Sequence, residues 1–536
     1  MPIPHSGDQE QGHIVSEAPQ NRTCTDTSYF IAIVTCCLLV IPFCVALSMG
    51  SDINRFIYGY DRFGNTCGVK NKPIYGINCS GKDLTNRPIA RLKYYPVNRC
   101  MLHSTKKLLP DVCVDRCIPP NKLIFHRCYP AGHVHLDDNS KLFKNMTEIF
   151  HAISESIITI VAMALAGLVL SLLMFVCLRW HHTTVIFWAM VIFQLIASAT
   201  ATSLLWLRYG TSETKQTLYL LAALGAMVYF FFIVLFVVVV HDAFPLITRL
   251  YDEAIAAIFR MPTIMVHLLT ALVAVVMSTS FMIFLLVLIF SNQCLQESDD
   301  PLTLEYTTTS STFIFACYVI FVMLWVYAFA EGWQCMITAG SVGQYYLARD
   351  KSILQHPVRK SYHLLTRYHL GTVACGSLFV TALSFMRYLA NYFVRKVFAL
   401  TALHGQTFQK SSVQLTKLMI LNWFHAVAIT GFHYILKCGF SCLILLLTVG
   451  LGTWMHLENI YTYYTRVAIL CGALIANVVA CFVMQVLSVS VDTVFLCFCE
   501  EQAKDRSGDV HGTYLAPTPK NYKEPEELKE DRQDTN

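Results

Sequence analysis

Long apolar runs with at most one formal charge dominate the hydrophobic pattern of this chain. Each of the longest runs has about 20 or more residues, which is enough for a helix to cross the ~30 Å hydrocarbon core of a bilayer. They lie at residues 29–49, 156–178, 183–207, 218–240, 263–290, 311–348, 432–454 and 467–491. Backbone groups in lipid need internal hydrogen-bond partners, so continuous runs of this kind form helices. The pattern predicts an all-α, polytopic transmembrane helix bundle.

Residues 371–431 follow a less regular pattern. The segment 371–386 is apolar but short for a complete span, and the residues after it mix apolar and basic side chains. The basic residues are Arg387, Arg395, Lys396, Lys410 and Lys417. Two further spans, a re-entrant pair and amphipathic helices on the inner surface all fit this pattern. Two further spans would bring the total to about ten.

The charges of the short loops predict the orientation, because Lys and Arg are enriched on the cytoplasmic side. Residues 349–370 hold five Lys or Arg, whereas 291–311 hold four Asp or Glu and no Lys or Arg. We therefore expect the first loop in the cytosol and the second outside. Applied to the whole chain, this predicts a cytosolic tail 1–28, a first helix 29–49 and an extracellular loop 50–155. Helices two to six follow in 156–348, with an amphipathic cytosolic connector at 242–262. A cytosolic basic loop 349–370, helices seven to ten in 371–491 and a cytosolic tail 492–536 complete the chain.

The predicted extracellular loop is rich in cysteine. Its six cysteines are Cys67, Cys79, Cys100, Cys113, Cys117 and Cys128. An even number of cysteines in an oxidising compartment favours disulfides. A metal site is the alternative, but Cys113 and Cys117 have no matching second pair. Glycosylation sequons at Asn78 and Asn145 lie in the same loop. We predict a disulfide-bonded, glycosylated extracellular loop after the first span.

Composition narrows the possible functions. Only 14% of the residues are charged, against about 25% in soluble domains. The net charge of +5 is small, and no dense basic patch indicates a nucleic-acid partner. The chain has no GxxxxGK[ST], HExxH or GxSxG motif, so we expect no enzyme, no resident cofactor and no metal site. Residues 1–20 are polar and do not resemble a signal peptide.

The run 311–348 contains the most informative candidate residues. Its aromatic and polar members are Tyr318, Trp325, Tyr327, Trp333, Glu331 and Gln334. A carboxylate inside a transmembrane helix is a functional candidate by default. Aromatic faces beside one carboxylate suit an organic cation such as a quaternary ammonium. Core packing is the alternative for each aromatic residue, and Trp333 also fits an interfacial belt. Trp188 and Trp206 are weaker candidates for the same site.

Several segments resemble one known family. They are GYDRFGNTCGVKN at 59–71, CVDRCIP at 113–119, FHRC at 125–128, AGSVGQYYLARDK at 339–351, RYHLGTVACGSL at 367–378 and VDTVFLCF at 491–498. In this order they resemble the choline transporter-like proteins, solute carrier family 44. The resemblance implies ten helices with cytosolic termini, and transport of choline for phospholipid synthesis at the plasma membrane. It adds ethanolamine as a further candidate substrate and the mitochondrial membrane as a second candidate location.

The chain also departs from the family pattern. Lys396, Val397 and Phe398 stand where the family often has Asn-Ala-Tyr. Ala328 stands where some members have Glu, and Glu331 follows one helical turn later. We expect a facilitative choline carrier that works by alternating access, with a small organic cation and the bilayer as partners and the oligomeric state open. A non-transporting receptor that acts through its extracellular loop is the alternative function.

Overall fold

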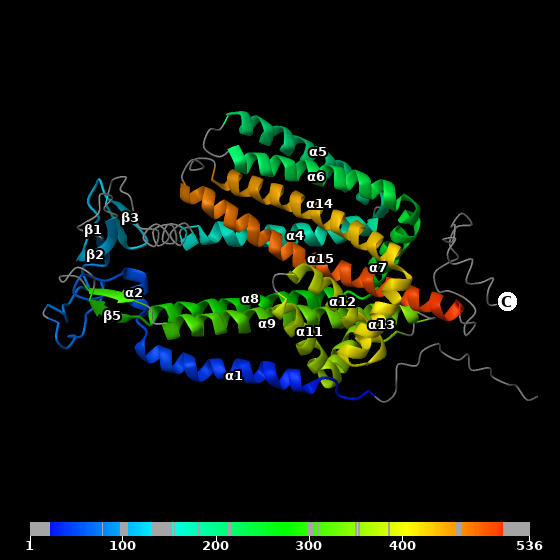
Figure 1. Cartoon of the computed structure of the whole chain (residues 1–536), viewed down its shortest axis with the longest axis horizontal. Helices are drawn as coiled ribbons and strands as arrows, with labels where there is room; N and C mark the ends of the chain where they lie inside the picture. Colours follow the sequence, from blue (N-terminus) through cyan, green and yellow to red (C-terminus); the bar gives the residue numbers. More distant parts are fainter. Residues whose placement is uncertain are drawn as a thin grey trace, which may run out of the picture.

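The computed structural model describes residues 22–77, 79–96, 106–130, 149, 153–154, 156–180, 183–211, 216–297, 304–307, 310–348, 351, 354–383, 386–456 and 463–506. Within these ranges, eight helical segments are long and apolar enough to cross a membrane. They contain α1 (Thr27–Gly50), α4 (Ile157–Trp180), α5 (Thr183–Thr211), α6 (Gln216–Val240), α8 (Thr263–Ser291), α9 (Ser310–Leu347), α14 (Trp423–Met455) and α15 (Tyr463–Arg506). They coincide with the eight predicted runs, which confirms the all-α polytopic bundle (Figure 1).

Shorter helices gather at one end of this bundle. They are α7 (Phe244–Arg260), α10 (Pro357–Leu364), α11 (Leu370–Ala382), α12 (Arg387–His404) and α13 (Phe408–Leu421), with a π-helical turn η2 (Leu365–His369) before α11. The described chain also begins and ends here, so we call this the terminus end (Figure 1). The predicted amphipathic connector corresponds to α7. Its apolar face is buried against α4, α9 and α15.

Helices α11 and α12 cover the first part of the segment 371–431, whose course the sequence pattern left open. They pack against each other and against α9 as a hairpin. Residues before α11 and at the end of α12 both contact Arg22, which precedes α1, so the hairpin starts and finishes at the terminus end. The 13 residues of α11 rise only about 20 Å, less than the bilayer core. Neither α11 nor α12 is among the eight candidate membrane spans of the described residues.

Short strands form the opposite end, which we call the strand end (Figure 1). Strands β1 (Ile89–Pro96), β2 (Lys106–Val114), β3 (Lys122–Ile124) and β4 (Arg127–Tyr129) form one sheet in the order β2-β1-β4-β3. Strands β5 (Cys294–Glu297) and β6 (Leu304–Thr307) form a separate antiparallel pair between α8 and α9. Arg55 links this end to the bundle, because its guanidinium donates to the Ser291 carbonyl at 2.9 Å and lies over the Tyr306 ring.

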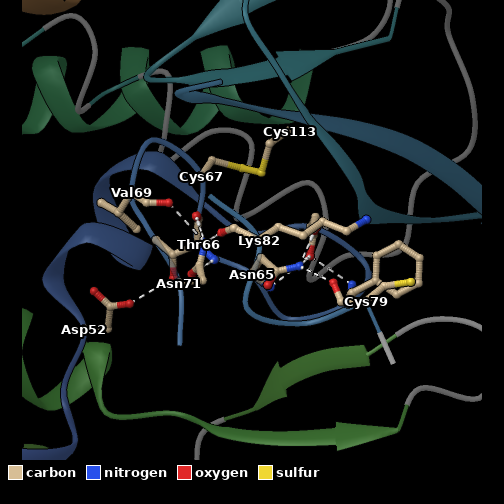
Figure 2. Close-up of a disulfide and its surroundings, with 11 residues drawn as sticks. Asp52, Asn65, Thr66, Cys67, Val69, Asn71, Cys79, Lys82 and Cys113 are labelled. Atoms are coloured by element: carbon tan, nitrogen blue, oxygen red, sulfur yellow. Dashed lines mark hydrogen bonds between the residues drawn. A yellow bond between two sulfur atoms is a disulfide. The ribbon is translucent and has the colours of Figure 1, made fainter. Parts of the chain in front are cut away.

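Disulfides hold the strand end together, as predicted, but with fewer cysteines than predicted. Cys67 is bonded to Cys113 (Figure 2), and Cys117 is bonded to Cys128. Cys79 is an exposed free thiol among the described residues, so its predicted disulfide is not present there. Its carbonyl instead accepts a hydrogen bond of 3.1 Å from the buried Asn65 amide. Cys100 and the sequon residues Asn78 and Asn145 lie outside the described residues.

The two disulfides are expected to differ in their contribution to stability. Cys67–Cys113 spans 46 residues and Cys117–Cys128 spans 11. In the chain-entropy model, closing these loops contributes about 4 and about 3 kcal/mol respectively. Cys113→Ser should therefore lower the heat-unfolding midpoint under non-reducing conditions more than Cys128→Ser, with Cys79→Ser as the control. A larger effect for Cys128→Ser would contradict the loop-length argument.

Candidate functional site

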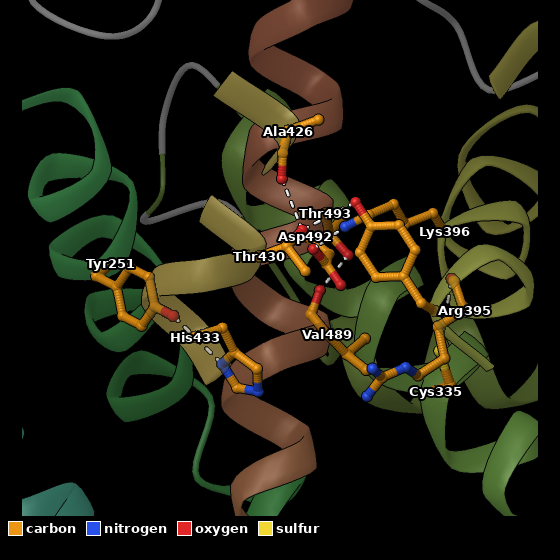
Figure 3. A network of polar contacts seen from close by, with 11 residues as sticks. Tyr251, Cys335, Arg395, Lys396, Ala426, Thr430, His433, Val489, Asp492 and Thr493 are labelled. Carbon is orange, nitrogen blue, oxygen red and sulfur yellow. Dashed lines mark hydrogen bonds and ion pairs between the residues drawn. The ribbon is translucent and has the colours of Figure 1, made fainter. Parts of the chain in front are cut away.

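A buried ion pair lies inside the helix bundle (Figure 3). Lys396 of α12 pairs with Asp492 of α15, and the two residues are only 1% and 8% exposed. The Lys396 ammonium also lies over the ring of Tyr392, 4.6 Å from its centre. Tyr392 comes one helical turn before Lys396 on the same face of α12. A charge at such a position is costly unless it is paired, and it marks a functional site in membrane proteins.

Hydroxyl and imidazole groups extend this pair into a network that joins four helices. The Tyr392 and Thr430 hydroxyls are 2.9 Å apart, and Thr430 of α14 also donates to the Ala426 carbonyl at 2.6 Å. On the other side of α14, His433 is hydrogen-bonded through Nδ1 to the hydroxyl of the fully buried Tyr251 of α7, at 3.2 Å (Figure 3). The network therefore fixes α7, α12, α14 and α15 relative to one another.

Several buried polar atoms around this network have no partner among the described residues. They are both amide atoms of Gln334, the amide nitrogen of Gln485, the Thr338 hydroxyl and the Arg395 Nε. Gln334 is only 2% exposed. Gln485 lies two turns before Asp492 on the same side of α15. Buried polar groups normally have a hydrogen-bond partner, so this arrangement is suited to water or a polar ligand between the helices.

Glu331 lies on the network side of α9. It is half-buried, and no described residue pairs with its carboxylate. The buried Cys335 thiol lies one turn after Glu331 on the same face of α9. Cys335 in turn contacts the Arg395 carbonyl at 3.7 Å. The face of α9 that carries Glu331 and Cys335 is therefore packed against α12 next to Lys396.

The structure places Trp325 elsewhere on α9. Its indole N–H donates to the Ala374 carbonyl at 3.2 Å and to the Ser377 hydroxyl at 3.1 Å, both on α11. Trp325 is 3% exposed and packs against Ile33 of α1. Six residues separate it from Glu331, which is about 120° around a helix. Trp325 and Glu331, which were predicted to bind one cation together, therefore lie on two different faces of α9.

The other predicted residues are also dispersed. Tyr318 donates to the Cys36 carbonyl of α1 at 2.9 Å, and Trp333 makes edge contacts with Phe329 and Tyr362. Tyr327 is half-buried. Trp206 is 42% exposed and contacts Tyr209. Of the predicted set, Tyr327, Glu331 and Gln334 share one face of α9, whereas Tyr318, Trp325, Trp333 and Trp206 make the contacts given above.

Trp188 belongs to a second feature, an aromatic cavity of about 270 Å³. Its aromatic lining comes from Phe187, Trp188, Phe236, Phe244 and Phe432. Phe187 and Phe432 stack with their ring centres 4.0 Å apart. Phe432 also contacts Tyr251 of the network, so the cavity is adjacent to the charged site.

The ion pair between Lys396 and Asp492 was not predicted from the sequence. The predicted last span stops at residue 491 because Asp492 is charged, yet α15 continues to Arg506 and buries Asp492 with the residues that follow. Lys396 is one of several basic residues in an irregular stretch. The available signal was a single acidic residue directly after a long apolar run, and its partner lies 96 residues earlier.

An N-terminal segment, Arg22–Asp26, closes the terminus end of the hairpin. Arg22 donates to the Ala402 and Leu403 carbonyls of α12, both at 3.3 Å. The Asp26 carboxylate accepts from the Thr372 hydroxyl at 2.9 Å and from the Phe408 amide at 3.0 Å. The segment therefore contacts the starts of α11 and α13 and the end of α12.

His369 lies beneath this segment. Burial and the Arg22 charge lower the pKa of His369 to about 4, so its ring is neutral at neutral pH. Arg22 can only donate, which makes the His369 Nε2, 3.3 Å away, the acceptor. The His369 Nδ1 then carries the hydrogen, and it faces the Thr25 hydroxyl at 3.0 Å.

A bundle of apolar helices with a charged network inside it and a disulfide-bonded end defines a polytopic membrane protein. Residues 224–503 match the family model described as plasma-membrane choline transporter, and the chain belongs to this family. All residues of the charged network lie within the matched range. The expected resemblance is thereby confirmed.

Named relatives cover most of the chain. Choline transporter-like protein 1 of Torpedo marmorata is 24% identical, and the alignment covers 91% of each chain. Choline transporter-like protein 1 of Xenopus laevis is 24% identical over 70% of this chain and 68% of its own. Choline transporter-like protein 2 of Dictyostelium discoideum is 22% identical over 86% of this chain and 88% of its own.

Proposed function

We propose that the protein is a facilitative transporter of choline that supplies phospholipid synthesis, with ethanolamine as a second substrate. The observation that carries this proposal is the charged network inside the bundle, built on Asp492, Lys396 and Tyr392. A carboxylate beside an aromatic face is the combination that binds a quaternary ammonium. The family match and the names of the relatives give the same substrate class.

The proposed location is the plasma membrane, with both termini in the cytosol. Supporting this orientation, α10 and η2, which carry Arg359, Lys360 and Arg367, lie at the terminus end, and the disulfides lie at the strand end. With this orientation an inward-moving cation gains about 2.3 kcal/mol per 100 mV of membrane potential. A coupled ion is not required for inward transport of a cation.

Alternating access is proposed to involve the α11–α12 hairpin. Helix α12 carries Lys396 and Tyr392, while the N-terminal segment holds its terminus end. Release of that segment would let the hairpin move away from α9 and open the site to the terminus end. The Phe398 ring of α12 fills the space beside Gly332 of α9 and Gly376 of α11, so the interface of these three helices is closed in the described state.

Choline uptake into proteoliposomes tests this function. Saturable uptake is expected from the wild-type protein, and Tyr392→Ala should weaken choline binding by more than about 1 kcal/mol, because it removes the aromatic face beside Asp492. Trp454→Ala, at an exposed position near the end of α14, is the matched control. Folded protein without any uptake would instead favour a receptor that acts through residues 50–155.

A further inference from the structure

The Lys396 side chain makes the same two contacts that a substrate ammonium needs. Its Nζ pairs with the Asp492 carboxylate and lies over the Tyr392 ring. A charge-assisted contact and a cation–π contact thus meet on one nitrogen, in a site from which bulk water is largely removed. The protein's own ammonium occupies this aromatic and acidic pocket.

A second cation cannot use Asp492 while Lys396 is bound there. The Asp492 carboxylate is already neutralised by the Lys396 ammonium, so an additional cation would gain little from it. Removal of Lys396 from Asp492 would leave the carboxylate free to attract the positive group of the substrate.

Glu331 offers Lys396 another partner. Glu331 lies one turn before Cys335, whose thiol contacts the carbonyl of Arg395 next to Lys396, and no hydrogen bond or ion pair joins the Glu331 carboxylate to another described residue. The Lys side chain is a flexible chain of four carbons, so its ammonium can exchange between nearby carboxylates by side-chain rotation.

We propose that Lys396 is a tethered competitor of the substrate: Asp492 and Tyr392 bind the quaternary ammonium, and Lys396 fills this site until the substrate displaces it toward Glu331. This inference rests on the proposed transport of choline and assigns the substrate's positive group to particular residues. In the carrier without substrate, Lys396 neutralises the Asp492 carboxylate. In the loaded carrier, the substrate's positive group pairs with Asp492 and Lys396 pairs with Glu331. The apparent affinity for choline is accordingly reduced by the competition with Lys396.

Choline-dependent thermal stabilisation of purified full-length protein tests the inference. Lys396→Gln removes the competing charge and keeps a hydrogen-bond donor for Asp492. We expect it to lower the half-saturating choline concentration at least tenfold relative to the wild type, and Lys396→Met should do the same if Lys396→Gln folds poorly. Lys417→Gln, at an exposed position of α13, should leave the wild-type value unchanged.

Double variants test whether the Tyr392 ring and the Asp492 carboxylate bind the substrate. Adding Tyr392→Leu or Asp492→Asn to Lys396→Gln should abolish the gain, whereas Tyr392→Phe keeps the ring and should preserve it. An unchanged choline concentration in folded Lys396→Gln and Lys396→Met overturns the competitor role while the wild-type uptake stands. If folded wild type and both variants all fail to respond to choline, the proposed function itself is wrong.

Discussion

Asp492→Ala is expected to destabilise the protein by about 3–5 kcal/mol, because it leaves the buried Lys396 ammonium without its carboxylate. The remaining charge is held at 1% exposure between α12 and α15. The unfolding temperature in detergent, followed by the loss of monodisperse protein on heating, measures this effect. Loss of choline uptake should accompany it even in the fraction that remains folded.

A double variant separates the charge from the loss of packing. Replacing both members of a buried pair by apolar residues of similar volume is often neutral or stabilising. Lys396→Met/Asp492→Leu should therefore recover most of the stability lost in Asp492→Ala, but not choline uptake. An unfolding temperature of Asp492→Ala equal to that of the wild type would mean that Lys396 does not depend on this partner.

Gly167→Leu is expected to have the second large effect, about 3 kcal/mol or more, because it forces α4 and α15 apart. A Cβ at Gly167 would lie 2.8 Å from both the Cβ and the carbonyl oxygen of Ala476. Overpacking of this kind typically costs 1–3 kcal/mol, and here the obstacle is backbone that no side-chain rotation can move. Close approach at small residues is how membrane helices gain packing contacts.

Gly225 provides the matched control. It lies on α6, and a Cβ there would meet nothing within 4 Å. Gly225→Leu should keep the wild-type unfolding temperature and uptake, whereas Gly167→Leu should lose both. Equal tolerance of the two leucines would show that α4 and α15 do not need their close crossing.

The course of the transmembrane helices was predictable because the bilayer imposes one rule on every spanning segment. A long apolar run has to become a helix, whatever its neighbours are. Residues 29–49 and 263–290 therefore fall within α1 and α8, and 311–348 extends one residue beyond α9. The hairpin could not be fixed in this way, because α11 and α12 are buried by protein contacts that depend on α1, α9 and α15.

The candidate site was predictable only in part, and for a related reason. Glu331 could be found because it is the only formal charge of its apolar run. Trp325 and Tyr318 could not be assigned, since an aromatic residue on a membrane helix can face a partner helix as well as a ligand; here both donate hydrogen bonds to neighbouring backbone carbonyls. The Lys396–Asp492 pair depends on tertiary proximity between residues that are 96 positions apart.

The N-terminal segment has a consequence for how the protein is handled. Residues Arg22–Asp26 behave as a built-in peptide ligand for the hairpin, and their attachment to α1 keeps them at a high effective concentration. Pulling on the tail, trimming it or phosphorylating Thr25 would act directly on the start of α11. A fluorescent protein fused close to Arg22 therefore risks changing the transport rate, and a long flexible spacer or a C-terminal fusion is the safer design.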